Sequence, residues 1–174
     1  LLAWKLVLAG SLAVAVFGSI HALEVMDLRY SAHTAQSAPA FAVLLWCFVA
    51  VCTTYVFGTL LTAAGDLRLL NWMAAAGALL NIGLNWWLIP LWQAEGAAWA
   101  SLATQVLTAV VQVVLVARAW RFGGLGQVAL RALLYAAALV LLALGVGRME
   151  WSFGLQLAIH AVVATVLAVL SGLV

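Results

Sequence analysis

The chain has 174 residues, of which 68% are hydrophobic and only 7% are charged, and its mean hydropathy is +1.22. Soluble domains carry about a quarter of their residues as charged side chains, so this composition excludes a water-soluble globule. The formal net charge of +2 comes without a Lys/Arg cluster, which excludes nucleic acid as a partner. Long apolar runs without strand-like alternation predict an all-α integral membrane protein.

In chain order, the apolar runs predict six transmembrane helices, at about 2–23, 39–62, 69–90, 96–118, 127–147 and 152–173. We group the first four as the region 1–126 and the last two as the region 127–174. Pro39 is expected to start the second helix, because its missing N–H would be unpaired there anyway, and Pro90 is expected to end the third. The connection from Glu24 to Ala38 is long and polar, so we expect a surface segment that is partly helical.

Charged residues are unequally divided between the two sides that six helices define. The side with both chain ends carries the basic residues Lys5, Arg68, Arg118, Arg121 and Arg131. The opposite side carries the basic residues Arg29 and Arg148 and the acidic residues Glu24, Asp27, Glu95 and Glu150. Since basic residues concentrate in cytoplasmic loops, we expect both ends in the cytoplasm.

Two neighbouring predicted helices carry uncharged polar residues at helical spacing. Asn81 and Asn85 lie one turn apart on the third helix. A stripe on the fourth helix consists of Ser101, Gln105, Thr108 and Gln112. These groups favour hydrogen bonding between packed helices, and the alternative is a water-filled cavity that accepts a polar head group.

The remaining polar residues indicate structure rather than chemistry. His160 lacks an intramembrane carboxylate partner, which predicts a packing role, and His21 and His33 are expected to be solvated. Cys47 and Cys52 lie five apart on one helix, so they cannot form a disulfide with each other. The sequence has no plausible acid/base pair, phosphate loop, Ser/His/Asp grouping or metal-ligand spacing. We therefore expect no enzyme activity, no metal and no cofactor.

The stretch LLNIGLNWWLIPLWQAEGAAWASLATQ, from Leu79 to Gln105, combines two asparagines, a Leu-Ile-Pro stop, a short loop and a Gly-Ala-Ala restart. It resembles the signature of bacterial polysaccharide flippases, which belong to the multidrug/oligosaccharidyl-lipid/polysaccharide flippase superfamily. The preceding LLTAAGDLRLLNWMAAAGALLN is similar to that family's join between two helices. The resemblance covers the chain from about Ala38 to Arg118.

This resemblance implies a fold of two six-helix lobes around a central cavity, sometimes with two extra helices. The six helices here would be the last six of fourteen, and the chain, which begins with Leu1 inside an apolar run, would be the C-terminal part of a longer protein. Its partners would be a lipid-linked glycan, membrane lipids and the N-terminal helices of the same protein. The implied function is translocation of lipid-linked oligosaccharide across the bacterial cytoplasmic (inner) membrane by alternating access.

Cavity candidates follow from the same resemblance. A lipid-linked glycan carries anionic phosphates, for which Arg68 and Arg131 are the best-placed cations, although both also fit positive-inside anchors. The polar candidates are Asn81, Asn85, Gln105 and Gln112. Three alternatives stay open: a flippase for the peptidoglycan-precursor lipid, a multidrug exporter of the same superfamily, and a membrane scaffold without transport. An exporter of cations would need a buried carboxylate, and none is expected here.

Overall fold

The computed structural model describes residues 2–121, 123–148 and 151–173, and this part of the chain is all-helical. Its helices are α1 (Leu2–Ile20), α2 (Ala22–Arg29), α3 (Thr34–Ala63), α4 (Leu67–Trp120), α5 (Leu125–Val146) and α6 (Phe153–Leu170). All except α2 are long and apolar enough to cross a membrane, which gives five candidate membrane-spanning helices. The chain therefore has the architecture of a multi-pass membrane protein. Glu150, one of the charged residues assigned to the side away from the chain ends, lies outside the described residues.

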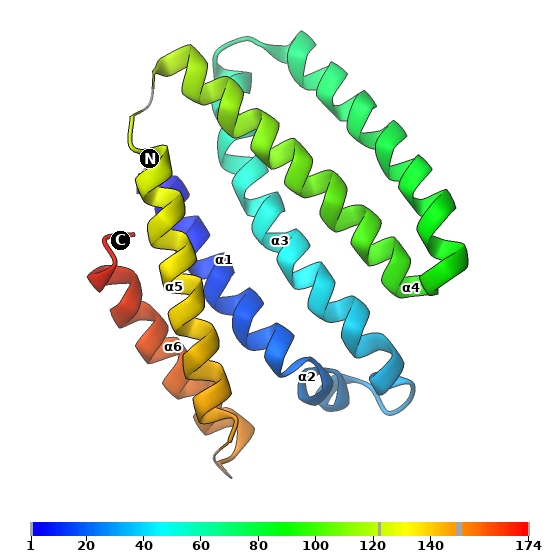
Figure 1. Ribbon diagram of the computed structural model, residues 1–174, viewed down its shortest axis with the longest axis vertical. Helices are drawn as coiled ribbons and strands as arrows, with labels where there is room; N and C mark the ends of the chain where they lie inside the picture. The colour runs from blue at the N-terminus through cyan, green and yellow to red at the C-terminus, as the bar shows by residue number, and fades with distance from the viewer. Residues whose placement is uncertain (1, 122, 149–150, 174) are drawn as a thin grey trace.

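Helix α4 contains both the third and the fourth predicted helices. Its 54 residues would reach roughly 81 Å as a straight helix, far more than the hydrocarbon core of about 30 Å. The helix instead reverses direction at Gln93, whose φ of 50° and ψ of −123° are not helical. Figure 1 shows the two arms, 67–92 and 94–120, running side by side in opposite directions.

Both proline predictions are wrong in detail. The first arm of α4 continues through Pro90, and the chain reverses three residues later at Gln93. Pro90 removes one backbone donor, and this loss does not stop a helix that ends within the next turn. Helix α3 begins at Thr34, so Pro39 lies inside it rather than at its first position. The earlier start follows from His33, which turns the chain with a φ of 58° and whose carbonyl accepts the Ser37 N–H and hydroxyl.

The first predicted helix also ends earlier than expected. It stops at Ile20, and the chain turns at His21 into the short helix α2. The expectation of a partly helical connection is confirmed by α2. His33 is exposed as expected, whereas His21 is only 4% exposed, so the prediction of a solvated His21 is wrong.

The helices form one antiparallel bundle with both ends of the chain at the same end (Figure 1). Helix α1 lies in the middle, with α5 and α6 on one side and α3 on the other, and the α4 hairpin packs against α3. The core gathers side chains from α1, α3, α4 and α5, among them Trp4, Leu8, Leu12, Val16, Phe57, Leu61, Val116, Tyr135 and Leu139. Helix α1 thus contacts α2, α3, α5 and α6, and α3 connects it to the α4 hairpin.

Polar groups in this core are paired across helices. The Trp4 indole N–H donates to the Thr53 hydroxyl at 3.4 Å, and the Trp4 and Phe57 rings meet edge-on at 5.1 Å. The Tyr135 hydroxyl lies 3.4 Å from the Ala9 carbonyl oxygen and 3.2 Å from that of Ala164. A single phenol on α5 therefore links α1 to α6.

Helix α3 carries several threonines and both cysteines. Its threonine hydroxyls donate to carbonyls one turn earlier on the same helix, as in the bond from Thr59 to Tyr55 at 2.7 Å and from Thr62 to Gly58 at 2.9 Å. Cys47 and Cys52 are free thiols. The threonine hydroxyls are therefore satisfied within α3, and the prediction that the two cysteines do not pair is confirmed.

Candidate functional site

The amides of the first α4 arm form a hydrogen-bonded ladder with the second arm. The Asn85 side-chain N–H donates to the Asn81 amide oxygen at 2.8 Å, and the Asn81 N–H donates to the Thr104 hydroxyl at 3.4 Å. The Thr104 hydroxyl in turn donates a hydrogen bond to the Ala100 carbonyl oxygen at 2.8 Å. Asn81 therefore ties one arm to the other, and Asn85 bonds to Asn81 from the same arm. Hydrogen bonds of this kind between packed helices are common for amides in a membrane.

The hairpin closes through a backbone contact at Gly96. A β-carbon built at this position would overlap the carbonyl group of Leu88, with its carbon atom only 2.6 Å away. Farther along the arms, Gly77 faces Thr104 and Thr108, each 3.7 Å from where a β-carbon would be. The glycines allow the two arms to lie almost backbone to backbone.

A narrow cavity of about 160 Å³ lies between the two arms. The residues lining it are Met73, Ala76, Gly77, Leu80, Thr104, Leu107, Thr108 and Val111. It is too small for a glycan, because pockets for drug-sized ligands start at about 300 Å³. The polar ladder therefore borders a small, mainly apolar space within the hairpin.

Gln112 of the second arm lies against α3 rather than in this ladder. Gln112 is 7% exposed, and its amide lies against Gly58 of α3, with both terminal atoms 3.5 Å from a β-carbon built there. Its Oε1 has no hydrogen-bond partner within the described residues. Gln105 is half-buried and makes no hydrogen bond to another described residue. The polar stripe expected on the fourth helix is thus divided: Thr108 faces Gly77 of the first arm, and Gln112 faces Gly58 of α3.

The two cationic candidates lie in different parts of the bundle. Arg131 of α5 donates to the Gly172 carbonyl oxygen at 3.4 Å, beside Lys5, which donates to the same atom at 3.0 Å. Two cations therefore compensate the negative carbonyl end of α6. Arg68, at the start of α4, is exposed and has no ion pair within the described residues. The start of α4 and helix α5 lie on separate sides of the bundle (Figure 1).

A cluster of two histidines and two phenylalanines, which the sequence did not predict, lies where α1, α2 and α6 meet. The Phe17 ring lies 4.5 Å from the ring of His21 and 5.0 Å from that of His160, and Phe153 completes the group. His160 Nε2 lies 3.2 Å from the Ala13 carbonyl oxygen, whereas His21 Nε2 and His160 Nδ1 are buried without a partner within the described residues. His21 and His160 are 139 positions apart in the sequence, so no local sequence pattern could have indicated that they share one cluster.

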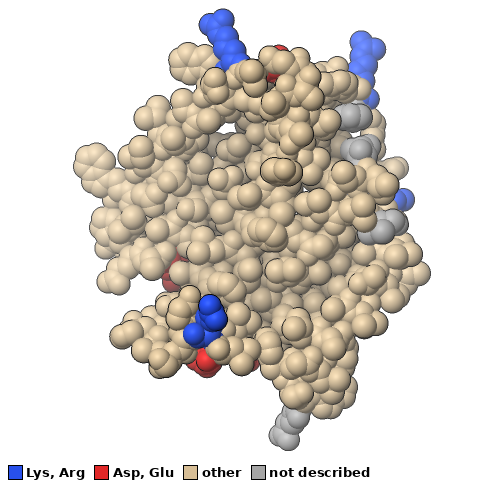
Figure 2. Space-filling model, turned by 180° about the vertical axis from the view of Figure 1, so that it is seen from behind, with Lys and Arg blue, Asp and Glu red and all other residues tan. Residues whose placement is uncertain are grey.

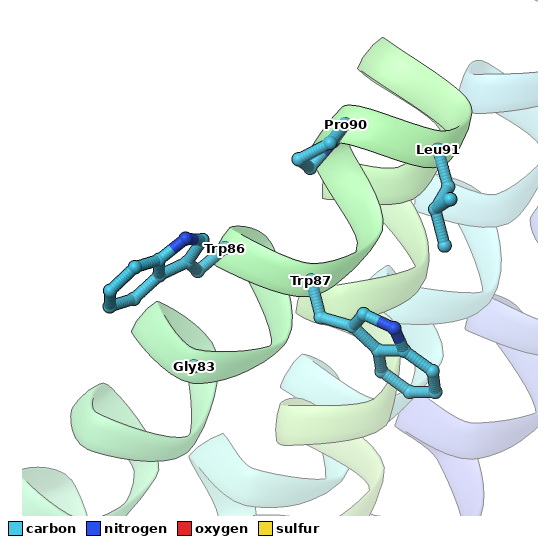
Figure 3. A pocket seen from close by; sticks show the side chains of 5 residues that line it. All are labelled: Gly83, Trp86, Trp87, Pro90 and Leu91. Carbon is cyan, nitrogen blue, oxygen red and sulfur yellow. The ribbon is translucent and has the colours of Figure 1, made fainter.

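An aromatic hollow of about 500 Å³ lies on the outer surface of the first α4 arm (Figure 3). The residues around it are Gly83, Trp86, Trp87, Pro90 and Leu91. Figure 3 shows the two indoles projecting from the helix in different directions, and their exposed fractions are 82% and 67%. The side chains around this hollow carry no charge, so it suits lipid or another apolar helix better than a glycan.

Reactive clusters do not accompany these features in the described parts of the chain. No group of three or more His, Cys, Asp and Glu residues there could hold a metal ion. The four described acidic side chains, Glu24, Asp27, Asp66 and Glu95, are all exposed. What this arrangement offers is binding and packing chemistry, through amides at the α4 hairpin and cations at the helix ends.

Comparisons with known proteins return nothing. No family model, curated protein or solved structure matches this chain.

Proposed function

We propose that this bundle is the C-terminal part of a flippase that moves lipid-linked oligosaccharide across the bacterial cytoplasmic membrane. In this proposal, the two arms of α4 each cross the bilayer, so that the chain contributes six spans. A second lobe, formed by helices that precede them in the same protein, provides the opposite wall of the cavity. Rocking of the lobes exposes the cavity to each side in turn.

The observation that supports the proposal most directly is the α4 hairpin. Three residues that carry the resemblance have a part in this one structure: Asn81 bonds to the second arm, Asn85 bonds to Asn81, and Gly96 lets the arms touch. Pro90 precedes the reversal at Gln93 by three residues. A motif with this structural role supports the two-lobe flippase fold. The assignment of lipid-linked oligosaccharide as the cargo rests on the resemblance alone.

The outer face of the first α4 arm supports the two-lobe arrangement. Between residues 67 and 92 only Leu88 is fully buried, so this arm packs against the rest of the bundle along one narrow side. Large apolar side chains point outward, including Trp72 at 68%, Ile82 at 63% and Leu79 at 71% exposure. Such a surface suits lipid or a neighbouring helix of another lobe.

The distribution of basic residues supports a cytoplasmic location for the end of the bundle that holds both chain ends. Lys5 and Arg131 both donate to Gly172 near the end of the chain. Arg68, Arg118 and Arg121 lie at the start and the end of α4, which are at the same end of the bundle (Figure 1). Figure 2 shows cationic side chains in the upper half of the bundle and a further cation next to acidic atoms in the lower half. By the positive-inside rule, the upper end is cytoplasmic.

Within this proposal, Arg68 is the better candidate for the phosphates of the cargo. Arg131 already donates to the end of α6, whereas Arg68 is exposed and forms no ion pair in the described part of the chain. A cationic drug is a poorer cargo for this part, since its described carboxylates are all exposed. A scaffold without transport remains the competing function.

Reconstitution in liposomes tests the proposal. The full protein, with the helices preceding Leu1, and the isolated chain are each placed in vesicles with a fluorescent lipid-linked oligosaccharide. We expect the full protein to move the glycan and the isolated chain to match empty vesicles. Flipping by the isolated chain would refute the two-lobe mechanism. Transport of only the peptidoglycan precursor, or of only a cationic dye, would change the assigned cargo. No transport by the full protein would favour the scaffold.

A further inference from the structure

An apolar pocket of about 460 Å³ lies at the end of the bundle away from the chain ends. Four helices contribute to it, namely α1, α2, α3 and α6, with α3 and α6 on opposite sides of α1 (Figure 1). The residues lining it are Ala13, Val14, Phe17, Gly18, Val25, Leu28, Arg29, Phe41, Leu45, Phe153, Leu157, His160 and Ala161. Its volume is that of a site for a small molecule, and its lining is almost entirely hydrocarbon.

The pocket has the length of one lipid leaflet rather than the shape of a compact polar site. Along α6 it extends from Phe153, the first residue of the helix, to Ala161, a rise of roughly 12 Å. Half of a hydrocarbon core measures about 15 Å. Since the other helices around it also end nearby, the pocket runs from the membrane surface towards the midplane.

The pocket is open to lipid at its rim and closed at its floor. Val14, Leu28 and Leu157 are 54%, 71% and 46% exposed, whereas Phe17 and His160 are 6% and 3% exposed. An acyl chain could therefore enter from the side and lie against a rigid aromatic floor.

Arg29 is the charged residue in this lining. It lies in the last turn of α2, is exposed, and forms no ion pair or hydrogen bond within the described residues. Asp27 is two positions away on the same helix, a spacing at which side chains do not face each other. A guanidinium at the polar end of a hydrocarbon pocket is complementary to a phosphate attached to an acyl chain.

We propose that this pocket binds an anionic glycerophospholipid of the surrounding bilayer, with one acyl chain between α3 and α6 and the phosphate at Arg29. The site is separate from the α4 hairpin and independent of the cargo. The bound lipid holds α2 against the bundle by joining Arg29 to the walls that α3 and α6 provide.

Photocrosslinking tests this site. The protein is placed in nanodiscs containing phosphatidylglycerol with a diazirine in one acyl chain, irradiated, digested and analysed by mass spectrometry. We expect crosslinks to concentrate on 13–18, 41–45 and 153–161. Phosphatidylcholine with the same chain should label these segments about fivefold less, the ratio that one basic residue contributes near an anionic lipid.

Matched variants separate the head-group contact from the chain contact. Arg29→Gln should reduce labelling by phosphatidylglycerol to the level of phosphatidylcholine, whereas Arg148→Gln, an exposed arginine outside this lining, should leave it unchanged. Ala161→Phe fills the pocket from its exposed rim and should reduce labelling by both lipids. Its control is Ala137→Phe, which adds the same bulk to an exposed position on α5.

The melting temperature of each variant is measured beside its labelling, so that a loss of folded protein is recognised. Equal labelling by the two lipids, or no effect of Arg29→Gln, would overturn the head-group assignment. Labelling spread evenly around the bundle would overturn the site itself. Stronger labelling by a photoreactive polyprenyl phosphate than by phosphatidylglycerol would replace the phospholipid with the tail of a cargo.

Discussion

Gly96 touches the main chain of Leu88, so closely that position 96 has no room for a β-carbon. The contact joins the two arms of α4 just beyond the reversal at Gln93. Because the atoms concerned belong to the backbone rather than to a flexible side chain, relief requires one arm to move. The hairpin therefore depends on glycine at this position.

We expect Gly96→Ala to destabilise the protein by about 1–3 kcal/mol, the usual cost of adding bulk to a tightly packed site. Thermal unfolding in detergent, followed by circular dichroism or light scattering, measures this loss. Gly83→Ala is the matched control, because a β-carbon at position 83 of the same hairpin would meet nothing within 4 Å. Alanine there should be neutral or stabilising, since it favours helix more than glycine does. Equal effects of the two substitutions would contradict the close contact.

The Asn81–Thr104 bond should appear as an energetic coupling between the arms. Asn81→Leu and Thr104→Val should each cost about 0.5–2 kcal/mol, and the double variant less than their sum, because both remove the same bond. A fully additive cycle would show that the two side chains do not interact.

The same experiment distinguishes packing from cavity lining. If Asn81, Asn85 and Gln105 act in packing, their leucine variants should lose transport in proportion to the loss of folded protein. Wild-type stability with abolished transport would instead make these amides part of the glycan-binding surface.

Single-cysteine labelling tests whether α3 and the first α4 arm cross the membrane. In a background of Cys47→Ala and Cys52→Ala, His33→Cys and Glu95→Cys should react with an impermeant reagent from outside the cell, and Asp66→Cys only after permeabilisation. All three positions are exposed. Reaction of positions 33 and 66 from the same side would rule out a crossing by α3, and a protected position 33 in intact cells would reverse the orientation.

Removal of the cations at Gly172 should affect stability rather than transport. We expect Arg131→Gln and Lys5→Gln each to cost about 0.3–1 kcal/mol, because each cation compensates the carbonyl end of α6, and the loss should shrink as salt is added. Arg68→Gln serves as the contrasting variant, with a normal melting temperature and reduced transport. A stable Arg131→Gln protein that no longer transports would move the phosphate site to α5.

The sequence predicted the helices well because apolar length alone determines where a chain can cross a bilayer. It placed the ends less well, since Pro39 and Pro90 can lie inside helices when the lost hydrogen bond falls near a terminus. The contact between Asn81 and Asn85 was predictable from their spacing, but their partner on the second arm was not. Thr104 lies next to Gln105, and a rotation of one residue around the helix decides which of the two faces the asparagines.

The buried environment of His21 was beyond prediction for another reason. The residue lies at a helix end, where solvation is the usual state, and contacts such as those with Phe17 and Phe153 make it an interior side chain. The apolar pocket with Arg29 likewise combines four helices. Features of this kind come from tertiary packing, which composition and periodicity do not contain.

The central position of α1 has a consequence for biosynthesis. Ala9 meets Tyr135, which is 126 residues later in the chain, and Lys5 meets Gly172, which is 167 residues later. At a translation rate of roughly 5–20 residues per second, α1 leaves the ribosome on the order of ten seconds before α5 does. During this interval lipid, or the insertion machinery, must cover the side of α1 that α5 and α6 later occupy. If translation stalls after α4 and before α5, we therefore expect membrane quality control to recognise α1 in the nascent chain.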